Sequence, residues 1–70
     1  MTKVHALDQA IAQTLAATGQ PLTEREIETA AQVLQAARRA KIKVRARIRL
    51  LASMGRIQWD QAQQRPRFWV

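Results

Sequence analysis

The sequence feature that most limits the fold of this chain is a run of positive charge from Arg38 to Arg49. Seven of these twelve residues are cationic: Arg38, Arg39, Lys41, Lys43, Arg45, Arg47 and Arg49. No acidic residue lies between Glu28 and Asp60. Cations at this density need water or a polyanion beside them. One side of the element that carries them must therefore stay exposed, and the rest of the chain has to pack against the other side.

Charge is divided unequally between the two halves of the 70-residue chain, whose formal net charge is +7. Residues 1–36 carry two cations and four acidic residues. Residues 37–70 carry ten cations, and Asp60 is their single acidic residue. This asymmetry indicates one dedicated functional face rather than a generally charged, soluble surface. Nucleic acid is therefore the leading class of partner.

Length and composition exclude several other classes. A chain this short forms one domain, residues 1–70, with a thin core. Without cysteine there is no disulfide or thiolate metal site, and one histidine cannot form a zinc site, so we expect no metal and no cofactor. No apolar run reaches the roughly 20 residues of a membrane span, and the first residues lack a signal-peptide pattern. We expect a cytoplasmic, nucleoid-associated protein that has no membrane partner.

Residues 4–18 are predicted to form an amphipathic helix. The apolar residues on its expected buried face are Val4, Leu7, Ile11 and Leu15. These spacings are typical of a helix that packs one side onto a core. Gly19 follows in the position of a C-terminal cap, and Pro21 cannot continue a helix.

A second helix is predicted over residues 24–38. The Thr23 hydroxyl can accept a hydrogen bond from the amide of Glu26, and the Glu26 carboxylate can accept one from the amide of Thr23, which is a capping box. No Gly or Pro interrupts the chain between Thr23 and Gly55, so this helix is expected to be continuous. The apolar side expected to face the core contains Ile27, Ala30, Ala31, Leu34 and Ala37, with Val33 at its edge.

The stretch from Lys41 to Leu50 has two interpretations. Basic and apolar residues alternate strictly through it, which is the period-2 pattern of a strand. However, Ala, Arg, Lys and Leu are good helix formers and the alternation stops at Leu51, which favours a helix over residues 41–54. No Ser, Thr, Asp or Asn is present near residues 39–41 to cap that helix. The boundary between the second and third helices therefore stays open.

In the helical interpretation the third helix has an apolar side and a basic side. Val44, Ile48 and Leu51 share the apolar side, and Lys43 and Arg47 fall near its border. The basic side lies about 100° away around the helix. Its members are Arg38, Lys41, Arg45 and Arg49.

A β-hairpin is predicted after the third helix, with strands over residues 56–60 and 66–70 and a polar loop between them. Trp59 and Phe68 are expected in the core beneath this hairpin. Trp69 lies on the opposite side of its strand from Phe68. It therefore either packs separately or lines a binding face.

The third helix ends in Leu50-Leu51-Ala52-Ser53-Met54-Gly55-Arg56-Ile57, and an aromatic strand follows. This segment is similar to the Leu-x-x-x-Gly-x-Ile pattern that closes the recognition helix in the winged helix-turn-helix family. The element order, three helices and then a hairpin, resembles the same family over nearly the whole chain. The resemblance implies a mainly α fold with a small β-hairpin (α+β). It also implies a third helix in the major groove of DNA and a hairpin wing on the adjacent backbone or minor groove.

The predicted function is a DNA-binding module in a regulator of transcription or replication, with double-stranded DNA as the partner. Arg45 and Arg49 are the predicted readers of guanine edges, and the other cations are expected to contact phosphates. The residues predicted to contact nucleic acid are Arg38, Arg39, Lys41, Lys43, Arg45, Arg49, Gln63, Gln64, Arg65, Arg67 and Trp69.

Two alternatives remain open at this point. The same fold could be a protein–protein interaction module that docks an acidic partner, or it could bind RNA or single strands, with Trp69 stacked on a base. A homodimer and a place inside a larger host protein are both compatible with the sequence. Catalysis is not expected, since the carboxylates are scattered and neither a nucleophile motif nor a phosphate-binding loop is present.

Overall fold

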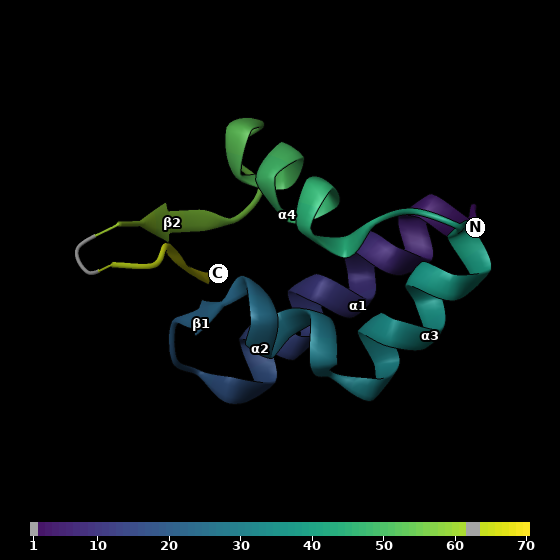
Figure 1. The fold of residues 1–70 in the computed structure, drawn as a ribbon, viewed down its shortest axis with the longest axis horizontal. Coiled ribbons are helices and arrows are strands. Elements are labelled where there is room, and N and C mark those ends of the chain that lie inside the picture. The colour runs from purple at the N-terminus through teal and green to yellow at the C-terminus, as the bar shows by residue number, and fades with distance from the viewer. Residues whose placement is uncertain (1, 62–63) are drawn as a thin grey trace.

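The computed structural model describes residues 2–61 and 64–70, and within them the chain is mainly helical with a small antiparallel sheet (Figure 1). The predicted α+β class is thereby confirmed. In chain order the elements are α1 (Lys3–Thr18), β1 (Leu22–Thr23), α2 (Glu24–Thr29), α3 (Ala31–Ala40), α4 (Val44–Ser53), β2 (Gln58–Asp60) and β3 (Arg67–Trp69).

The first helix forms as its sequence predicts. The hydroxyl of Thr2 accepts a hydrogen bond from the amide of His5 and caps the N-terminus of α1. At the other end Gly19 adopts a left-handed conformation, with φ 66°, and its amide donates to the carbonyl of Leu15. The buried residues of α1 are Leu7, Ala10, Ile11, Thr14 and Leu15.

The prediction of one continuous helix over residues 24–38 is wrong. Helix α2 ends at Thr29, Ala30 is extended with ψ 131°, and α3 starts at Ala31. In an unbroken helix Ile27 and Val33 would point about 120° apart and could not both face the centre of one core. The break allows both to be fully buried.

The same break moves Leu34 out of the core. A continuous helix would place Leu34 on the same side as Ile27, as the spacing predicted. In the structure Leu34 is instead 38% exposed. A local competitor for the helical hydrogen bonds lies at the break, where the hydroxyl of Thr29 donates to the carbonyl of Glu26. The predicted capping box at Thr23 is confirmed.

A turn over residues 41–43 separates α3 from α4, so the boundary left open by the sequence lies there. Lys41 is in the left-handed conformation, with φ 57° and ψ 42°, and closes α3. The helical interpretation of the alternating stretch is confirmed, but α4 starts at Val44 instead of residue 41. Lys43 stands at its N-cap without a side-chain hydrogen bond, because lysine carries no acceptor for the first amides of the helix.

The sheet has three strands in the order β1-β3-β2. In the predicted hairpin Trp59 lies opposite Phe68, although both strands are shorter than expected. The added strand, β1, pairs Leu22 with Phe68 and was not predicted. Two residues are too few to show a period, and only Pro21 hinted at an extended chain there.

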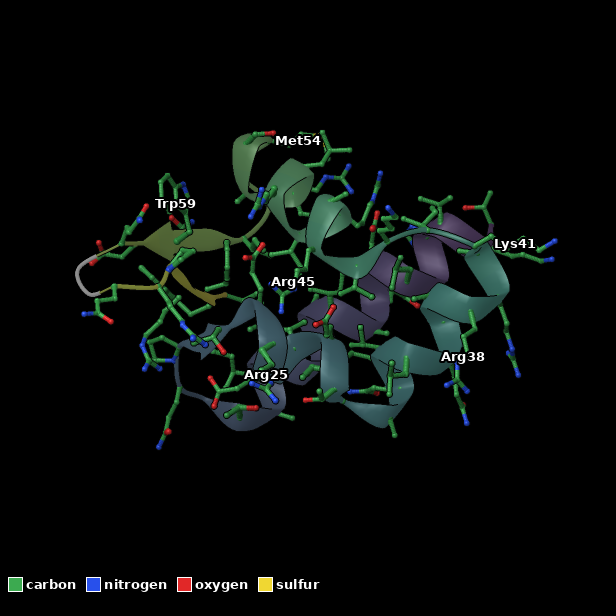
Figure 2. The ribbon with its side chains drawn as sticks, viewed as in Figure 1. Arg25, Arg38, Lys41, Arg45, Met54 and Trp59 are labelled. Carbon is green, nitrogen blue, oxygen red and sulfur yellow. The ribbon has the colours of Figure 1, made fainter. Side chains whose placement is uncertain are left out.

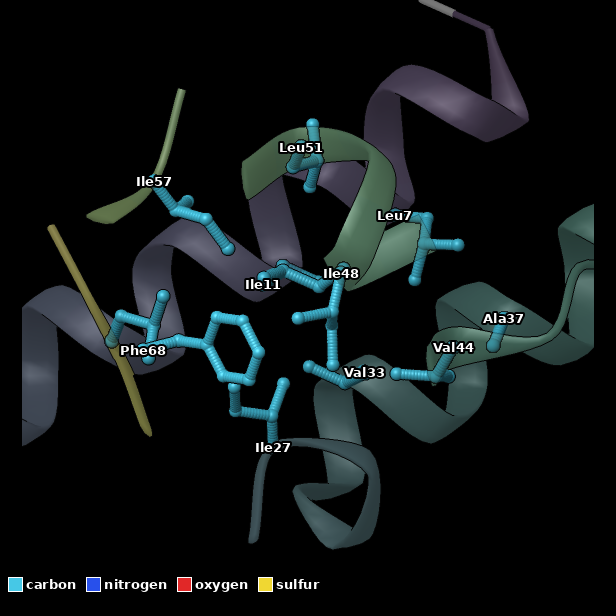
Figure 3. Packing of buried hydrophobic residues seen from close by; sticks show 12 residues of the cluster. Leu7, Ile11, Ile27, Val33, Ala37, Val44, Ile48, Leu51, Ile57 and Phe68 are labelled. Carbon is cyan, nitrogen blue, oxygen red and sulfur yellow. The ribbon is translucent and has the colours of Figure 1, made fainter. Parts of the chain in front are cut away.

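The core lies where the helices meet the inner face of the sheet (Figure 3). Phe68 is buried there, as predicted, because it lies on the central strand and the helices cover it. The prediction that Trp59 belongs to the core is wrong, since it is 53% exposed. Its strand, β2, is an edge strand in a hairpin that projects beyond the helices, so nothing comparable covers Trp59 (Figure 1).

Candidate nucleic-acid interface

Helix α4 lies at the outside of the molecule, across α1 and α2, with the hairpin directly after it (Figure 1). Val44, Ile48 and Leu51 are buried against the other helices, as the helical spacing predicted. The opposite side of α4 is exposed along its length. This helix therefore presents a continuous outer face between the turn 41–43 and the hairpin.

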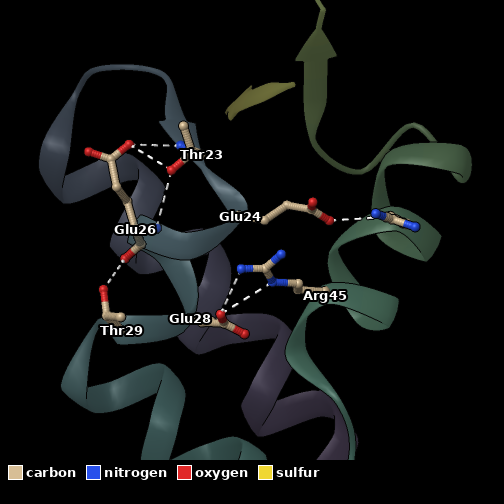
Figure 4. Close-up of polar contacts among 7 residues, drawn as sticks. Thr23, Glu24, Glu26, Glu28, Thr29 and Arg45 are labelled. Carbon is tan, nitrogen blue, oxygen red and sulfur yellow. Dashed lines mark hydrogen bonds and ion pairs between the residues drawn. The ribbon is translucent and has the colours of Figure 1, made fainter. Parts of the chain in front are cut away.

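Both arginines that were predicted to read bases pair with carboxylates of α2 (Figure 4). Arg45 donates from Nε and Nη2 to Oε1 of Glu28, at 3.2 and 3.1 Å. Arg49 donates from Nε to Oε2 of Glu24, at 3.1 Å. The prediction that Arg45 and Arg49 stand clear on a free basic side is wrong in this respect. They lie on the flank of α4 that faces α2, about 100° and 140° around the helix from Val44.

The opposite flank of α4 is tied to α1 by Arg47. Its guanidinium donates from Nε and Nη2 to the two carboxylate oxygens of Asp8, both at 2.7 Å. This hydrogen bond raises the pKa of Arg47 above its ordinary value, and the negative charge of Asp8 adds to the effect. The prediction that Arg47 lies at the border of the core is confirmed. Its charge is used within the fold.

Within the run 38–49 the cations without an ion pair gather at the end of α3 and in the turn that follows it. All four are exposed, and none has a carboxylate within 4 Å among residues 2–61 and 64–70. They are Arg38, Arg39, Lys41 and Lys43, and we call them the turn cluster. Figure 2 shows Arg38 and Lys41 at the end of the molecule opposite the hairpin, whereas Arg45 points inward between α4 and α2.

A second group of candidate residues lies on the hairpin. Gln64, Arg65 and Arg67 are exposed, and the two arginines have no ion pair within 4 Å in the described part of the chain. Trp69 is half-buried and lines a cleft of about 570 Å³ between the hairpin and the end of α1, together with Arg65 and Arg67. Gln63, also predicted to contact nucleic acid, lies outside the described residues.

Glu26 lies near this second group, and its carboxylate already accepts hydrogen bonds from Thr23. The pKa of its carboxyl lies below the ordinary value, first because the backbone amide of Thr23 donates to it and then because the Thr23 hydroxyl does so. The positive charge of Arg67 lowers this pKa a little further. Glu26 therefore stabilises the N-terminus of α2, and Arg67, which lies opposite Asp60 in the sheet, forms no ion pair within 4 Å with either carboxylate in the described part of the chain.

Sequence reasoning missed the chemistry of the outer face of α4. Ala46, Leu50 and Met54 recur there every four residues and are all exposed, and Ser53 lies between the last two. Leu50 is 45% and Met54 49% exposed, so together they place apolar surface on the outer face of α4. The four-residue spacing is present in the sequence, but it overlaps the stretch in which basic and apolar residues alternate, and that alternation is the stronger pattern.

Other kinds of site have less support. Among the described residues no group of three or more potential metal ligands comes together. None of the helices within residues 2–61 and 64–70 combines the length and the apolar character needed to cross a membrane. Comparison with protein-family models, with curated proteins and with solved structures finds no match to this chain.

Proposed function

We propose that this chain is a variant of the winged-helix fold that binds double-stranded DNA. Its role is that of a DNA-binding module in a regulator of transcription or replication. Three features support this proposal: the strand order β1-β3-β2, an exposed helix immediately before the hairpin, and a hairpin that projects beside that helix. Residues 2–61 and 64–70 contain one helix more than the three expected, because the break at Ala30 divides the second helix.

The observation that carries the proposal is the position of the uncompensated cations. The turn cluster precedes α4, and Arg65 and Arg67 follow it on the hairpin. The described chain measures 33 Å along its longest axis. Cations at both ends of one exposed helix suit a partner with repeated negative charge along its length, such as a duplex backbone.

In the proposed complex α4 enters the major groove and the cations on either side of it contact phosphates. Phosphate contacts fix the register of the helix on the duplex and supply most of the affinity. Arg47 serves a different purpose, because its largely buried ion pair with Asp8 holds α4 on α1, while Arg45 and Arg49 pair with carboxylates of α2.

The affinity of the chain for a short DNA duplex, measured by fluorescence anisotropy between about 50 and 200 mM salt, tests this proposal. Six neutralised phosphates, matching the turn cluster with Arg65 and Arg67, give a slope of about −5 in a plot of log affinity against log salt concentration. An affinity that barely changes over this range would contradict the proposal.

A matched pair of variants tests the assignment of roles. Replacing Arg39 and Lys43 of the turn cluster by Gln should reduce the steepness of the salt dependence by about 2. Arg45→Gln should leave the slope nearly unchanged, because that charge is already paired with Glu28. The opposite ranking would mean that α4 binds through its α2-facing flank.

Single-stranded nucleic acid is the second candidate, and the cleft at Trp69 favours it. An aromatic side chain beside Arg65 and Arg67 could stack on an unpaired base while the arginines bind its phosphates. A single strand of the same length, added as a competitor, separates the two candidates. The duplex proposal expects the single strand to compete poorly and to leave the fluorescence of Trp69, measured in a Trp59→Phe variant, unquenched.

A further inference from the structure

The outer face of α4 carries a line of exposed apolar side chains. Ala46 and Leu50 lie on the side opposite the buried residues of the helix, and Met54 continues this line by one further turn. Figure 2 shows Met54 at the outer edge of α4, away from the other helices. We call Ala46, Leu50 and Met54 the apolar ridge.

The polar side chains beside this ridge already have partners. Arg45, Arg47 and Arg49 donate to Glu28, Asp8 and Glu24. The hydroxyl of Ser53 donates to the carbonyl of Leu50, at 2.7 Å. Arg49 donates only through Nε and its side chain is 72% exposed, so the unused donors lie on the flank toward α2, beside the apolar ridge.

The major groove displays one group that matches such a surface, the 5-methyl group of thymine. The other groups at its floor are hydrogen-bond donors and acceptors, which lose water without compensation when they meet Leu or Met. We propose that the apolar ridge recognises thymine methyl groups, so that α4 favours duplexes with thymine at the contacted positions. This inference rests on the proposed duplex binding and names its specificity.

The charges around the ridge favour this occupant over an apolar protein surface or a second copy of the chain. The turn cluster lies before α4, and Arg65 and Arg67 lie beyond it. Two copies that met through their ridges would bring these cations toward one another without an acidic partner. A duplex instead supplies phosphates on both sides of the groove that the ridge enters.

The test compares two duplexes of identical A·T-rich sequence, one with thymine and one with deoxyuridine at every thymine position. The two differ only in the 5-methyl groups. Burial of one methyl group corresponds to about a fourfold change in affinity. We therefore expect the chain to bind the thymine duplex at least about fourfold more tightly than the deoxyuridine duplex at the same salt concentration.

Leu50→Ala should abolish most of this difference while keeping the salt dependence. Leu34→Ala is the matched control, because Leu34 is also an exposed leucine of a helix but lies on α3, away from the ridge. It should keep the full preference for thymine. Met54→Gln provides a second ridge variant, should Leu50→Ala lose its helical circular dichroism.

Equal affinity for the two duplexes, each with a steep salt dependence, would overturn this inference and leave the proposed function in place. Absence of salt-dependent duplex binding would overturn both. Concentration-dependent dimerisation of the chain alone, lost in Leu50→Ala and kept in Leu34→Ala, would overturn the inference by showing that the ridge binds a second copy.

Discussion

Arg47 of α4 and Asp8 of α1 form a two-point ion pair, in which both nitrogen–oxygen distances are 2.7 Å. The two side chains are only 19% and 13% exposed, whereas the Arg45 side chain, paired with Glu28, is 52% exposed. Parallel hydrogen bonds between a guanidinium and a carboxylate fix distance and orientation together. This pair therefore sets the angle at which α4 lies on α1.

Asp8→Asn should destabilise the fold by about 2 kcal/mol, because it leaves the largely buried charge of Arg47 without its partner. Urea unfolding followed by circular dichroism measures this free energy. Glu28→Gln is the control, since its exposed partner Arg45 can regain water, and it should cost less than about 1 kcal/mol. Equal costs for the two variants would mean that the Asp8 pair does not anchor α4.

Thr23→Ala should destabilise the chain by about 1 kcal/mol, because it removes the hydroxyl that caps α2. Thermal or urea unfolding of the variant checks this value. Thr2→Ala removes the equivalent hydroxyl cap of α1. Its cost should be smaller, because helix ends near a chain terminus fray. A larger loss at Thr2 than at Thr23 would contradict the role assigned to the α2 cap.

The cap of α2 should also make stability depend on pH through Glu26. Its pKa in the folded chain lies below the ordinary value of 4.5, so its contribution is present above that pH and is lost as the pH falls through the lower folded pKa. Glu26→Gln should therefore be less stable than the parent at neutral pH, and the difference should shrink in acid. A difference that is independent of pH would show that the carboxylate charge contributes nothing to the cap.

Lys41→Gly should separate stability from binding. Lys41 has φ 57°, a conformation that glycine adopts without steric cost, so the variant should be more stable by about 1 kcal/mol. It should also weaken duplex binding and reduce the salt slope by about 1. Lys41→Ala loses the same charge and keeps the strain, so it should bind like Lys41→Gly without the gain in stability.

Removing the carboxylates that hold the α4 arginines should strengthen duplex binding. With Glu24 and Glu28 both replaced by Gln, Arg45 and Arg49 can turn to phosphates, and the salt slope should steepen from about −5 to about −7. Glu26→Gln is the matched control, because it removes an α2 charge that pairs with no α4 arginine. A similar gain in the control would indicate a general charge effect.

Much of the fold follows from local patterns in the sequence. The cap at Gly19, the capping box at Thr23 and the buried spacing of Val44, Ile48 and Leu51 are each set by neighbouring residues. The break at Ala30 is different, since Ala is a good helix former and nothing beside it forbids continuation. Its cause is tertiary, because only a broken helix buries both Ile27 and Val33.

The candidate site shows the same limit. The charge between residues 38 and 49 was evident from the sequence, but its division into paired and unpaired cations was not. Asp8 is separated from Arg47 by 39 positions, and Glu24 from Arg49 by 25. Only the packing of α4 on α1 and α2 brings these partners together, so the arginines expected to read bases are paired with carboxylates of α2.

Titration of the isotope-labelled chain with a short DNA duplex, followed by amide chemical shifts, tests the central claim most directly. The duplex proposal expects the largest shifts at residues 38–54 and 64–69, which contain the turn cluster, α4 and the second strand of the hairpin. The glutamines Gln9, Gln13 and Gln32, which line a groove between α1 and α3 together with Arg39, should remain unperturbed. Shifts confined to that groove, or no shifts at all at low salt, would contradict the claim that this chain binds nucleic acid through α4 and the cations at its two ends.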